Sequence, residues 1–158
     1  MKKNFTHKGF MIVEILIAIS IITVSILSAI AVSEKSIFVS RQALHAGEAG
    51  FLLEEGAEVV RILRDNGWNN ISVLDTATNY YPIFSSPNWS LSLTPNTVGI
   101  FTRTVTITNV NRDDATKDIS ESGTNDAGTK LITITVSWPE GGTTINKTLS
   151  FYIMDIFS

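Results

Sequence analysis

The stretch HKGFMIVEILIAIS, residues 7–20, opens the apolar run that decides how this chain folds. Residues 10–32 form 23 consecutive positions with a single charge, Glu14. A helix of that length rises about 34 Å, and the hydrocarbon core of a bilayer is roughly 30 Å thick. The run is preceded by three lysines, Lys2, Lys3 and Lys8. Because basic residues stay in the cytoplasm, the pattern predicts one membrane span with the N-terminus inside.

Two simpler interpretations of this run stay open. A secretory signal peptide also has a basic start and an apolar middle, and residues 29–31 (Ala-Ile-Ala) offer a small-x-small cleavage site. Such signals have an apolar region of about 7–15 residues, which is shorter than this run, and they gain nothing from Glu14. The other interpretation is a plain single-span anchor that carries a β-rich binding module outside the membrane.

Residues 8–14, Lys-Gly-Phe-Met-Ile-Val-Glu, resemble the cleavage motif of type IV prepilins. The resemblance implies that a prepilin peptidase cuts after Gly9. Residues 1–9 are then a leader peptide, and Phe10 becomes an N-methylated N-terminus. Glycine suits the cut because it disfavours helix by roughly 1 kcal/mol relative to alanine, which keeps the backbone accessible. Glu14 is then the fifth residue of the mature chain.

The resemblance also implies how the chain is assembled and with what. In type IV pilins and pseudopilins the glutamate pairs with the N-terminal amine of a neighbouring subunit, so Glu14 and Phe10 would act in assembly. The implied partners are other pilin subunits, the prepilin peptidase, a membrane platform and a cytoplasmic ATPase. The chain would wait in a bacterial inner membrane and then enter an extracellular or periplasmic filament. Pilus, type II secretion pseudopilus and DNA-uptake filament all remain open.

The helical pattern continues past the apolar run. No proline occurs before residue 82, so the sequence predicts one helix over residues 10–66, roughly 85 Å long. Gly67 is placed for a left-handed cap that ends it. Residues 52–68 resemble the end of the long helix in minor pilins. The second half is amphipathic, and the face expected to cover the rest of the protein contains Leu44, Leu52, Val59 and Leu63, widened by Phe51, Val60 and Ile62.

Small residues recur in the apolar half of the predicted helix. Such residues allow close helix packing in apolar surroundings. The alternative is that the hydroxyl groups bond back to the preceding turn. The residues concerned are Ser20, Thr23, Ser25, Ser28, Ala29 and Ala31.

From residue 67 onward, the alternation of apolar and polar residues predicts strands. The segments that alternate are 89–93, 101–110, 132–138 and 145–153. Residues 139–142, Pro-Glu-Gly-Gly, predict a hairpin turn between the last two strands. The expected product is an antiparallel sheet with one apolar face. A long helix packed on that face gives an α+β fold, the pilin fold, with residues 67–158 as a β-rich head.

Two polar segments of the head are expected to be irregular, residues 75–88 and residues 111–129. The second segment is rich in carboxylates that could collect Ca²⁺, with Asp113, Asp114 and Asp118 as weak candidates. Their spacing does not match an EF-hand loop. A solvated loop without metal is therefore the favoured interpretation.

Charge and cysteine content exclude several classes of function. The chain has no cysteine, which rules out thiol catalysis and Cys-based zinc sites. It also departs from the many type IV pilins that close their C-terminal region with a disulfide. The net charge is −3, and removal of the three leader lysines leaves 9 basic against 15 acidic residues. Such a surface argues against nucleic-acid binding, which needs clustered Lys and Arg.

The sequence gives no pattern for an enzyme or a cofactor. The only histidines are His7, in the leader, and His45, on the long helix. A Ser-His-Asp site would have to use His45, which is more simply a surface or interface residue. No phosphate-binding loop or zinc spacing occurs. We therefore expect a structural subunit, with no catalytic residues and no cofactor.

Overall fold

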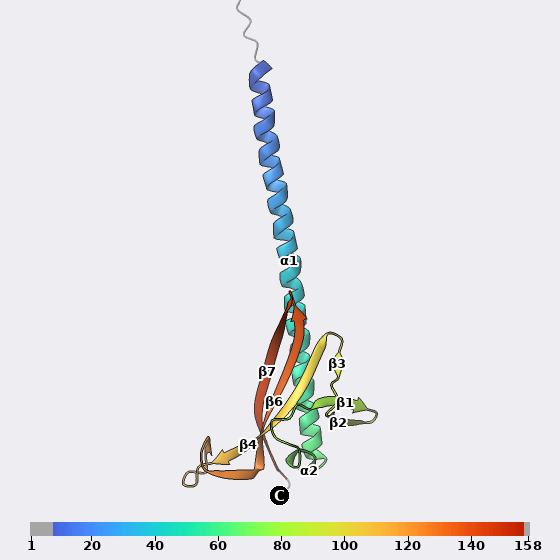
Figure 1. The fold of residues 1–158 in the computed structure, drawn as a ribbon, viewed down its shortest axis with the longest axis vertical. Helices are drawn as coiled ribbons and strands as arrows, with labels where there is room; N and C mark the ends of the chain where they lie inside the picture. The colour runs from blue at the N-terminus through green and yellow to red at the C-terminus, as the bar shows by residue number, and fades with distance from the viewer. Residues whose placement is uncertain (1–7, 157–158) are drawn as a thin grey trace, which may run out of the picture. The chain divides into compact units, whose positions relative to one another are not determined.

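A computed structural model of the 158-residue chain describes the backbone of residues 8–156 and the side chains of residues 11–156. The chain divides into two compact units, Met1–Leu44 and His45–Ser158. Helix α1 (Lys8–Asp65) is 58 residues long and contributes to both units (Figure 1). Its extent agrees closely with the prediction of one helix over residues 10–66.

The end of α1 has the expected glycine. The amide of Asn66 donates to the Ile62 carbonyl at 3.0 Å, and Gly67 follows with a φ of +140°. Because a side chain disfavours positive φ, glycine is the residue that can turn the chain here. A short helix α2 (Asn69–Ser72) comes next.

The head is built on an antiparallel sheet, as the alternating segments predicted. Its strand order is β3-β4-β6-β7, and β5 pairs with β4. A separate two-stranded sheet is formed by β1 and β2. The strand bounds are β1 (Tyr81–Ser85), β2 (Asn88–Ser92), β3 (Thr97–Val98), β4 (Phe101–Arg112), β5 (Ile119–Ser120), β6 (Thr124–Glu140) and β7 (Thr143–Met154). Helix packed on antiparallel sheet makes the fold α+β, which confirms the predicted fold class.

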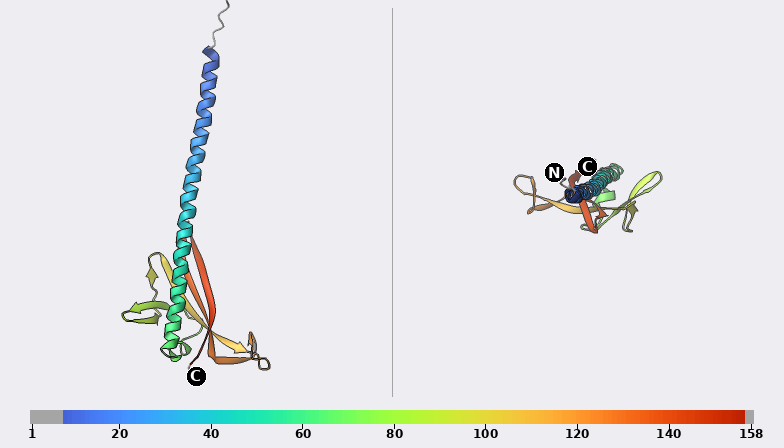
Figure 2. Two further views of the ribbon diagram at one scale, coloured as in Figure 1. Left: turned by 180° about the vertical axis from the view of Figure 1, so that it is seen from behind. Right: turned by 90° about the horizontal axis from the view of Figure 1, so that it is seen from above.

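The core of the head lies between the sheet and the part of α1 that belongs to the same unit (Figures 1 and 2). Every second residue of β6 points toward the helix, because side chains alternate along a strand. Ile132, Ile134 and Val136 are completely buried in this way. Burial of an aliphatic side chain of this size stabilises the fold by about 1.5–3 kcal/mol. The helix contributes Ala49, Leu53, Ala57, Val59, Val60 and Leu63 to the same core.

The predicted covering face of the helix was partly wrong. Leu44 and Phe51 are 60% and 74% exposed, whereas Ala49, Gly56 and Ala57 face the core. The reason is close packing: a Cβ on Gly56 would lie 3.0 Å from Cγ2 of Ile134. Small residues, rather than the largest apolar ones, allow the helix to approach the sheet this closely. Val59, Val60 and Leu63 are buried as predicted.

Residues 111–129 are not one loop, contrary to the prediction. Strand β4 continues to Arg112, β5 occupies Ile119–Ser120, and β6 begins at Thr124. We call this region, residues 109–130, the β4–β6 tip. A register shift between Asn109 and Val110 interrupts the pairing of β4 with β6. Backbone hydrogen bonds hold these polar strands together. Because neither strand has one continuous buried face here, apolar and polar residues do not alternate in the sequence.

Residues 75–88 also contain regular structure that the prediction missed. Strand β1 pairs with β2 from Tyr81↔Ser92 to Ser85↔Asn88. Tyr80 attaches this hairpin to the main sheet, because its amide and carbonyl both bond to Val105, at 2.9 and 2.8 Å. The rings of Phe84 and Trp89 lie 5.1 Å apart across the hairpin.

The predicted hairpin turn between the last two strands is confirmed. Strand β6 ends at Glu140 and β7 begins at Thr143, so Gly141 and Gly142 form a two-residue loop. Their φ angles are +58° and +84°. Two consecutive positive φ angles match the twist of the flanking strands, and glycine adopts them without steric cost. Strand β7 forms one edge of the sheet.

Candidate functional site

The apolar half of α1 is the first candidate site. Residues 11–32 expose their side chains throughout. By length and composition, α1 is the one helix in the described part of the chain that could cross a membrane. An apolar surface of this size is unfavourable in water, so the segment requires lipid or other helices around it. Glu14 lies on this surface, on one helix face with Ile17, Ala18 and Ile21.

The predicted cleavage site lies at the start of the described chain. The backbone of Gly9 and Phe10 belongs to α1. The Phe10 side chain and residues 1–7 of the leader, with Lys2 and Lys3, lie outside the described residues. Cleavage after Gly9 and pairing of Glu14 with an amine on Phe10 therefore stay predictions.

The hydroxyl groups of the apolar half bond within their own helix. Each donates to the carbonyl four residues earlier, at 2.7–2.8 Å, for example Ser20 to Leu16 and Ser28 to Val24. This satisfies the hydroxyls in an apolar environment. Within the single chain the hydroxyl groups therefore bond back to the preceding turn, which was the alternative to a role in helix packing. The residues concerned are Ser20, Thr23, Ser25 and Ser28. Ala29 and Ala31, both exposed, remain small-residue positions for close helix packing.

Sequence reasoning missed a largely buried contact between two polar side chains of the head. Nδ1 of His45 lies 2.5 Å from Oε2 of Glu140, and the two side chains are 19% and 3% exposed. The prediction placed Glu140 in a turn and His45 at a surface or an interface. A usable signal was present, because the alternation through Ile132, Ile134, Val136 and Trp138 continues inward to Glu140.

A second missed contact is the buried side chain of Arg103, which is 4% exposed on β4. Its Nη1 lies 2.9 Å from Oε1 of Glu55 and donates to the Leu52 carbonyl at 3.2 Å. The guanidinium carbon lies 5.9 Å from the centre of the Trp89 ring. Arg103 thus links helix α1, strand β4 and the β1–β2 hairpin around Gly56. On the exposed side of α1, Nη1 of Arg61 lies 3.3 Å from Oε2 of Glu58, three residues earlier.

The weak metal candidates take part in turns and loop contacts. Oδ1 of Asp113 accepts hydrogen bonds from the amides of Ala115 and Thr116, each at 2.8 Å. These amides, first that of Thr116 and then that of Ala115, lower the pKa of Asp113 below its ordinary value. Asp114 accepts a bond from the Thr124 hydroxyl at 2.7 Å. Within residues 8–156 no group of three or more His, Cys, Asp or Glu is arranged to hold a metal ion.

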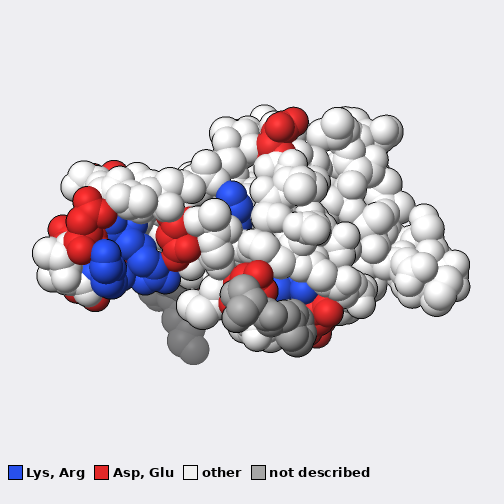
Figure 3. Space-filling view, turned by 90° about the horizontal axis from the view of Figure 1, so that it is seen from below, with Lys and Arg blue, Asp and Glu red and all other residues white. Residues whose placement is uncertain are grey.

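Many charged side chains of the head belong to the β4–β6 tip. In the view of Figure 3 they gather at the left end, where Figure 1 places the β4–β6 tip. Residues 76–102, which include the β1–β2 hairpin, contain no Asp, Glu, Lys or Arg. The tip therefore carries many of the charged side chains of the head. Among its carboxylates, Asp126 has the most hydrogen-bond partners. Oδ2 of Asp126 accepts from Arg112 Nε at 2.6 Å and from the Thr129 hydroxyl at 2.7 Å.

We expect Asp126→Asn to lower the stability of the head at pH 7 by about 1 kcal/mol, because the pair is partly exposed to solvent. The Thr129 hydroxyl and then Arg112 lower the pKa of Asp126 below its ordinary value. A lowered folded-state pKa stabilises the fold above the unfolded value and loses that contribution as pH falls through the folded value. Thermal unfolding at pH 7 and below about pH 4 should show the difference shrinking with acid. Asp118→Asn, at an exposed position of the same tip, is the control. Equal effects of the two variants would contradict this role of Asp126.

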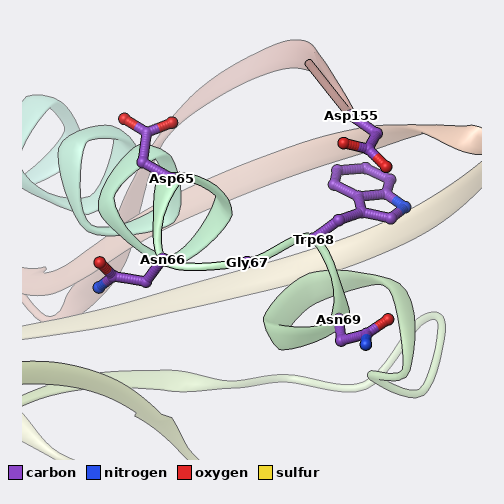
Figure 4. Close-up of a pocket in the computed structure, with 6 residues that line it drawn as sticks. All are labelled: Asp65, Asn66, Gly67, Trp68, Asn69 and Asp155. Carbon is purple, nitrogen blue, oxygen red and sulfur yellow. The ribbon is translucent and has the colours of Figure 1, made fainter. Parts of the chain in front are cut away.

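A shallow hollow of about 480 Å³ lies where the end of α1 meets the C-terminal end of β7 (Figure 4). Figure 4 shows the Asp155 carboxylate beside the Trp68 ring. The indole Nε1 of Trp68 donates to the Ala127 carbonyl at 3.3 Å, so the strand region holds the ring in place. Asp65 bonds to Arg64 at 2.8 Å. The lining residues are Asp65, Asn66, Gly67, Trp68, Asn69 and Asp155.

Comparisons of the chain with protein-family models, curated protein sequences and solved structures gave no match. The functional argument therefore rests on the residues themselves and on the α+β architecture with its long apolar helix.

Proposed function

We propose that this chain is a structural subunit, a minor pilin or pseudopilin, of a type IV pilus-like filament. The single observation that carries the proposal is helix α1. One unbroken helix of 58 residues joins an apolar, membrane-length segment to an amphipathic segment that covers the sheet of the head. A soluble domain gains nothing from the apolar segment, whereas a subunit that packs this segment against copies of itself does.

The remaining support comes from the sequence around the start of that helix. Gly9, Phe10 and Glu14 stand at the spacing of the prepilin motif, and Glu14 is the only charge in residues 10–32. Cleavage after Gly9 removes three lysines that hold the leader in the cytoplasm and creates a positive amine on Phe10. That amine can neutralise Glu14 of a neighbouring subunit. Within one helix, Glu14 lies about 6 Å along the axis from Phe10. The pair would set the axial register of the filament.

On this proposal the chain is inserted in a bacterial inner membrane with its N-terminus in the cytoplasm. A prepilin peptidase cuts it, and a membrane platform with a cytoplasmic ATPase extracts it into the filament. The head then faces outward, either outside the cell or in the periplasm. The second candidate is a membrane-anchored or secreted binding module, favoured by the same membrane-length helix if its leader is retained.

Mass spectrometry of the mature N-terminus separates the two candidates. We expect a chain that begins at methylated Phe10 in cells that contain a prepilin peptidase. The matched control is Gly9→Val, which should accumulate as the uncut precursor because valine obstructs the peptidase and favours a regular backbone at the cut. A mature chain that begins at Val32, or an intact leader in the wild-type protein, would refute the filament proposal.

A further inference from the structure

The free side of strand β7 (Thr143–Met154) is an uncovered edge of the main sheet. β7 pairs with β6, and in Figures 1 and 2 no other strand of the described chain runs along its outer side. Residues 143–150 are all exposed. The opposite edge differs, because β3, β5 and the backbone bonds of Tyr80 cover parts of β4. Within residues 8–156, the sheet is therefore open along one full strand.

Every second residue of β7 directs its backbone groups away from the sheet. The two-residue loop makes Glu140 and Thr143 a hydrogen-bonded pair, and bonded and non-bonded pairs alternate along antiparallel strands. The odd-numbered residues of β7 thus bond to β6. The amide of Asp155, the next odd position, continues this pattern by bonding to the Gly128 carbonyl at 2.9 Å. The even-numbered residues from Thr144 to Met154 therefore present their amides and carbonyls on the free side.

β7 lacks the features by which natural sheets block an open edge. Such features are proline, a β-bulge, a very short strand or a charge that extends over the edge. Residues 143–154 contain no proline, and their pairing with β6 has no register shift over 12 residues. Lys147 is the one charged residue of the strand, and its Nζ donates to the Ala46 carbonyl at 3.2 Å. A strand with these properties is suited to pair with another extended strand.

The side chains of β7 are divided between two chemically different faces. From Ile145 to Ile153 the odd-numbered residues are apolar apart from Lys147, and they lie on the side of the sheet that faces α1. Ile145 and Leu149 on this face are still 38% and 36% exposed. The even-numbered residues from 144 to 150 are Thr, Asn, Thr and Ser. A partner strand should therefore be apolar on one face and rich in hydroxyls on the other, which describes β7 itself.

A second copy of β7 fits this edge in the antiparallel direction. Residues directly opposite each other in such a pair lie on the same face of the sheet. With a twofold axis at Leu149, this residue lies opposite the partner's Leu149. Thr148 then lies opposite the partner's Ser150, and both have free backbone groups that can bond across the pair. Lys147 lies opposite the partner's Phe151, so no like charges are opposed.

Helix α1 projects little over this edge. The turn of α1 beside Lys147 contains Ala46, Gly47 and Gly50, which have little or no side chain. A Cβ on Gly47 would meet nothing within 4 Å, and a Cβ on Gly50 would approach Nζ of Lys147 at an ordinary 3.7 Å. The inward-facing side chains of an added strand would therefore meet small residues at this turn.

We propose that β7 is a self-pairing edge, at which two copies of this chain join their sheets through antiparallel β7 strands. β7 runs in the same direction as α1 in the head. Lys147 bonds to Ala46 near the start of the strand, and the Arg61 guanidinium lies 5.5 Å from the centre of the Phe151 ring near its end. Antiparallel pairing therefore places residue 45 of the two copies at opposite ends of the pair.

This direction decides which copies can pair. The apolar segment of each chain precedes residue 45, so the paired heads fit copies that are carried on two surfaces facing each other. A single strand pair is a small interface, and display of many copies on one surface would strengthen it through multivalency. The inference rests on the head, and it applies equally to a filament subunit and to a membrane-anchored module.

Disulfide cross-linking tests the pairing, because the chain has no cysteine of its own. The full-length chain is reconstituted in lipid vesicles and mildly oxidised. At the proposed register residue 149 meets its own copy, so Leu149→Cys should give on the order of tenfold more covalent dimer than Thr144→Cys, since a disulfide needs Cα atoms within about 7 Å. The two copies of residue 144 would lie about 33 Å apart, at roughly 3.3 Å per residue.

A mixing experiment tests the register and the facing surfaces together. The register places Thr144 opposite the partner's Met154. Vesicles that carry Thr144→Cys, mixed with separately prepared vesicles that carry Met154→Cys, should therefore give a covalent heterodimer, whereas neither preparation should give dimer alone. A heterodimer that forms only when both variants share one vesicle would contradict pairing between facing surfaces.

Thr148→Pro is the blocking variant. The amide of Thr148 points to the free side, so proline removes a donor of the new ladder and leaves the bonds to β6 in place. Added to Leu149→Cys, it should return the dimer yield to that of Thr144→Cys with little change in melting temperature. Thr148→Lys, which puts a charge on the edge, should act alike if proline disturbs the fold. Equal dimer yields from Leu149→Cys and Thr144→Cys, or a yield that survives both substitutions of Thr148, would overturn the proposal.

Discussion

Glu14→Val should leave cleavage after Gly9 intact and should reduce incorporation of the chain into filaments at least tenfold. On the proposed function, the peptidase would act before assembly at a motif built on Gly9 and Phe10, so removal of the carboxylate should leave the cut unchanged. Assembly differs because each Phe10 amine would then enter the filament core without its counter-charge. Loss of one partner of a buried ion pair costs about 3–5 kcal/mol, which exceeds the 1.4 kcal/mol that corresponds to a tenfold change in an equilibrium.

Two further variants separate charge from shape at this position. Glu14→Gln has almost the same shape as the wild type and removes only the charge, so it should assemble as poorly as Glu14→Val. Glu34→Gln removes an exposed carboxylate beyond the apolar run and should assemble normally. The measurement is the ratio of mature chain in sheared filaments to mature chain in membranes. Normal filament levels for Glu14→Val would show that this glutamate has no role in assembly.

Gly56→Val should destabilise the head by about 2–3 kcal/mol, since overpacking of a well-filled core costs about 1–3 kcal/mol. A Cβ at this position would lie 3.0 Å from Cγ2 of Ile134 and 3.2 Å from Cδ of Arg103. Neither neighbour can move easily, because Ile134 is completely buried and Arg103 is held by Glu55 and the Leu52 carbonyl. The two γ-methyls of valine would enlarge the clash. The midpoint of thermal unfolding should fall by several degrees.

Gly47→Ala is the matched control for this prediction. It is also a glycine in α1, but a Cβ there meets nothing within 4 Å. Alanine should therefore stabilise the helix by up to about 1 kcal/mol. The two substitutions should shift the melting temperature in opposite directions. A neutral Gly56→Val would mean that α1 does not pack as closely on the sheet as the structure shows.

The sequence predicted the strands that have one buried face, because burial of one face makes apolar and polar residues alternate. The alternation of β6 and the hairpin at Gly141 and Gly142 could be identified because strand geometry fixes which residues turn inward. The limits of α1 were equally clear, from the absence of proline and the glycine at position 67. In the β4–β6 tip the side chains of residues 111–128 are exposed or only half-buried, so no period remains and the strands were taken for a loop.

The errors along α1 have a different physical cause. Leu44 and Phe51 look like core residues because they are large and apolar, yet the helix turns Ala49, Gly56 and Ala57 toward the sheet. Helical periodicity identifies the buried face of a helix only when the large apolar residues are the ones that are buried. Where a helix packs closely on a sheet, small residues are buried instead. Glu140 escaped notice for a related reason, since its partner lies 95 residues away on α1. Spacing within a strand cannot reveal a partner on another element.

The position of β7 at the edge of the sheet has a consequence for how the head is made. The central strand β6 pairs with β4 on one side and with β7 on the other. A chain that stopped at residue 142 would therefore leave one side of β6 without backbone partners beside its apolar row from Ile132 to Trp138. Such an open edge promotes aggregation. A head that lacks β7 would thus expose one edge of β6 and lose the buried side chain of Ile153 from the core.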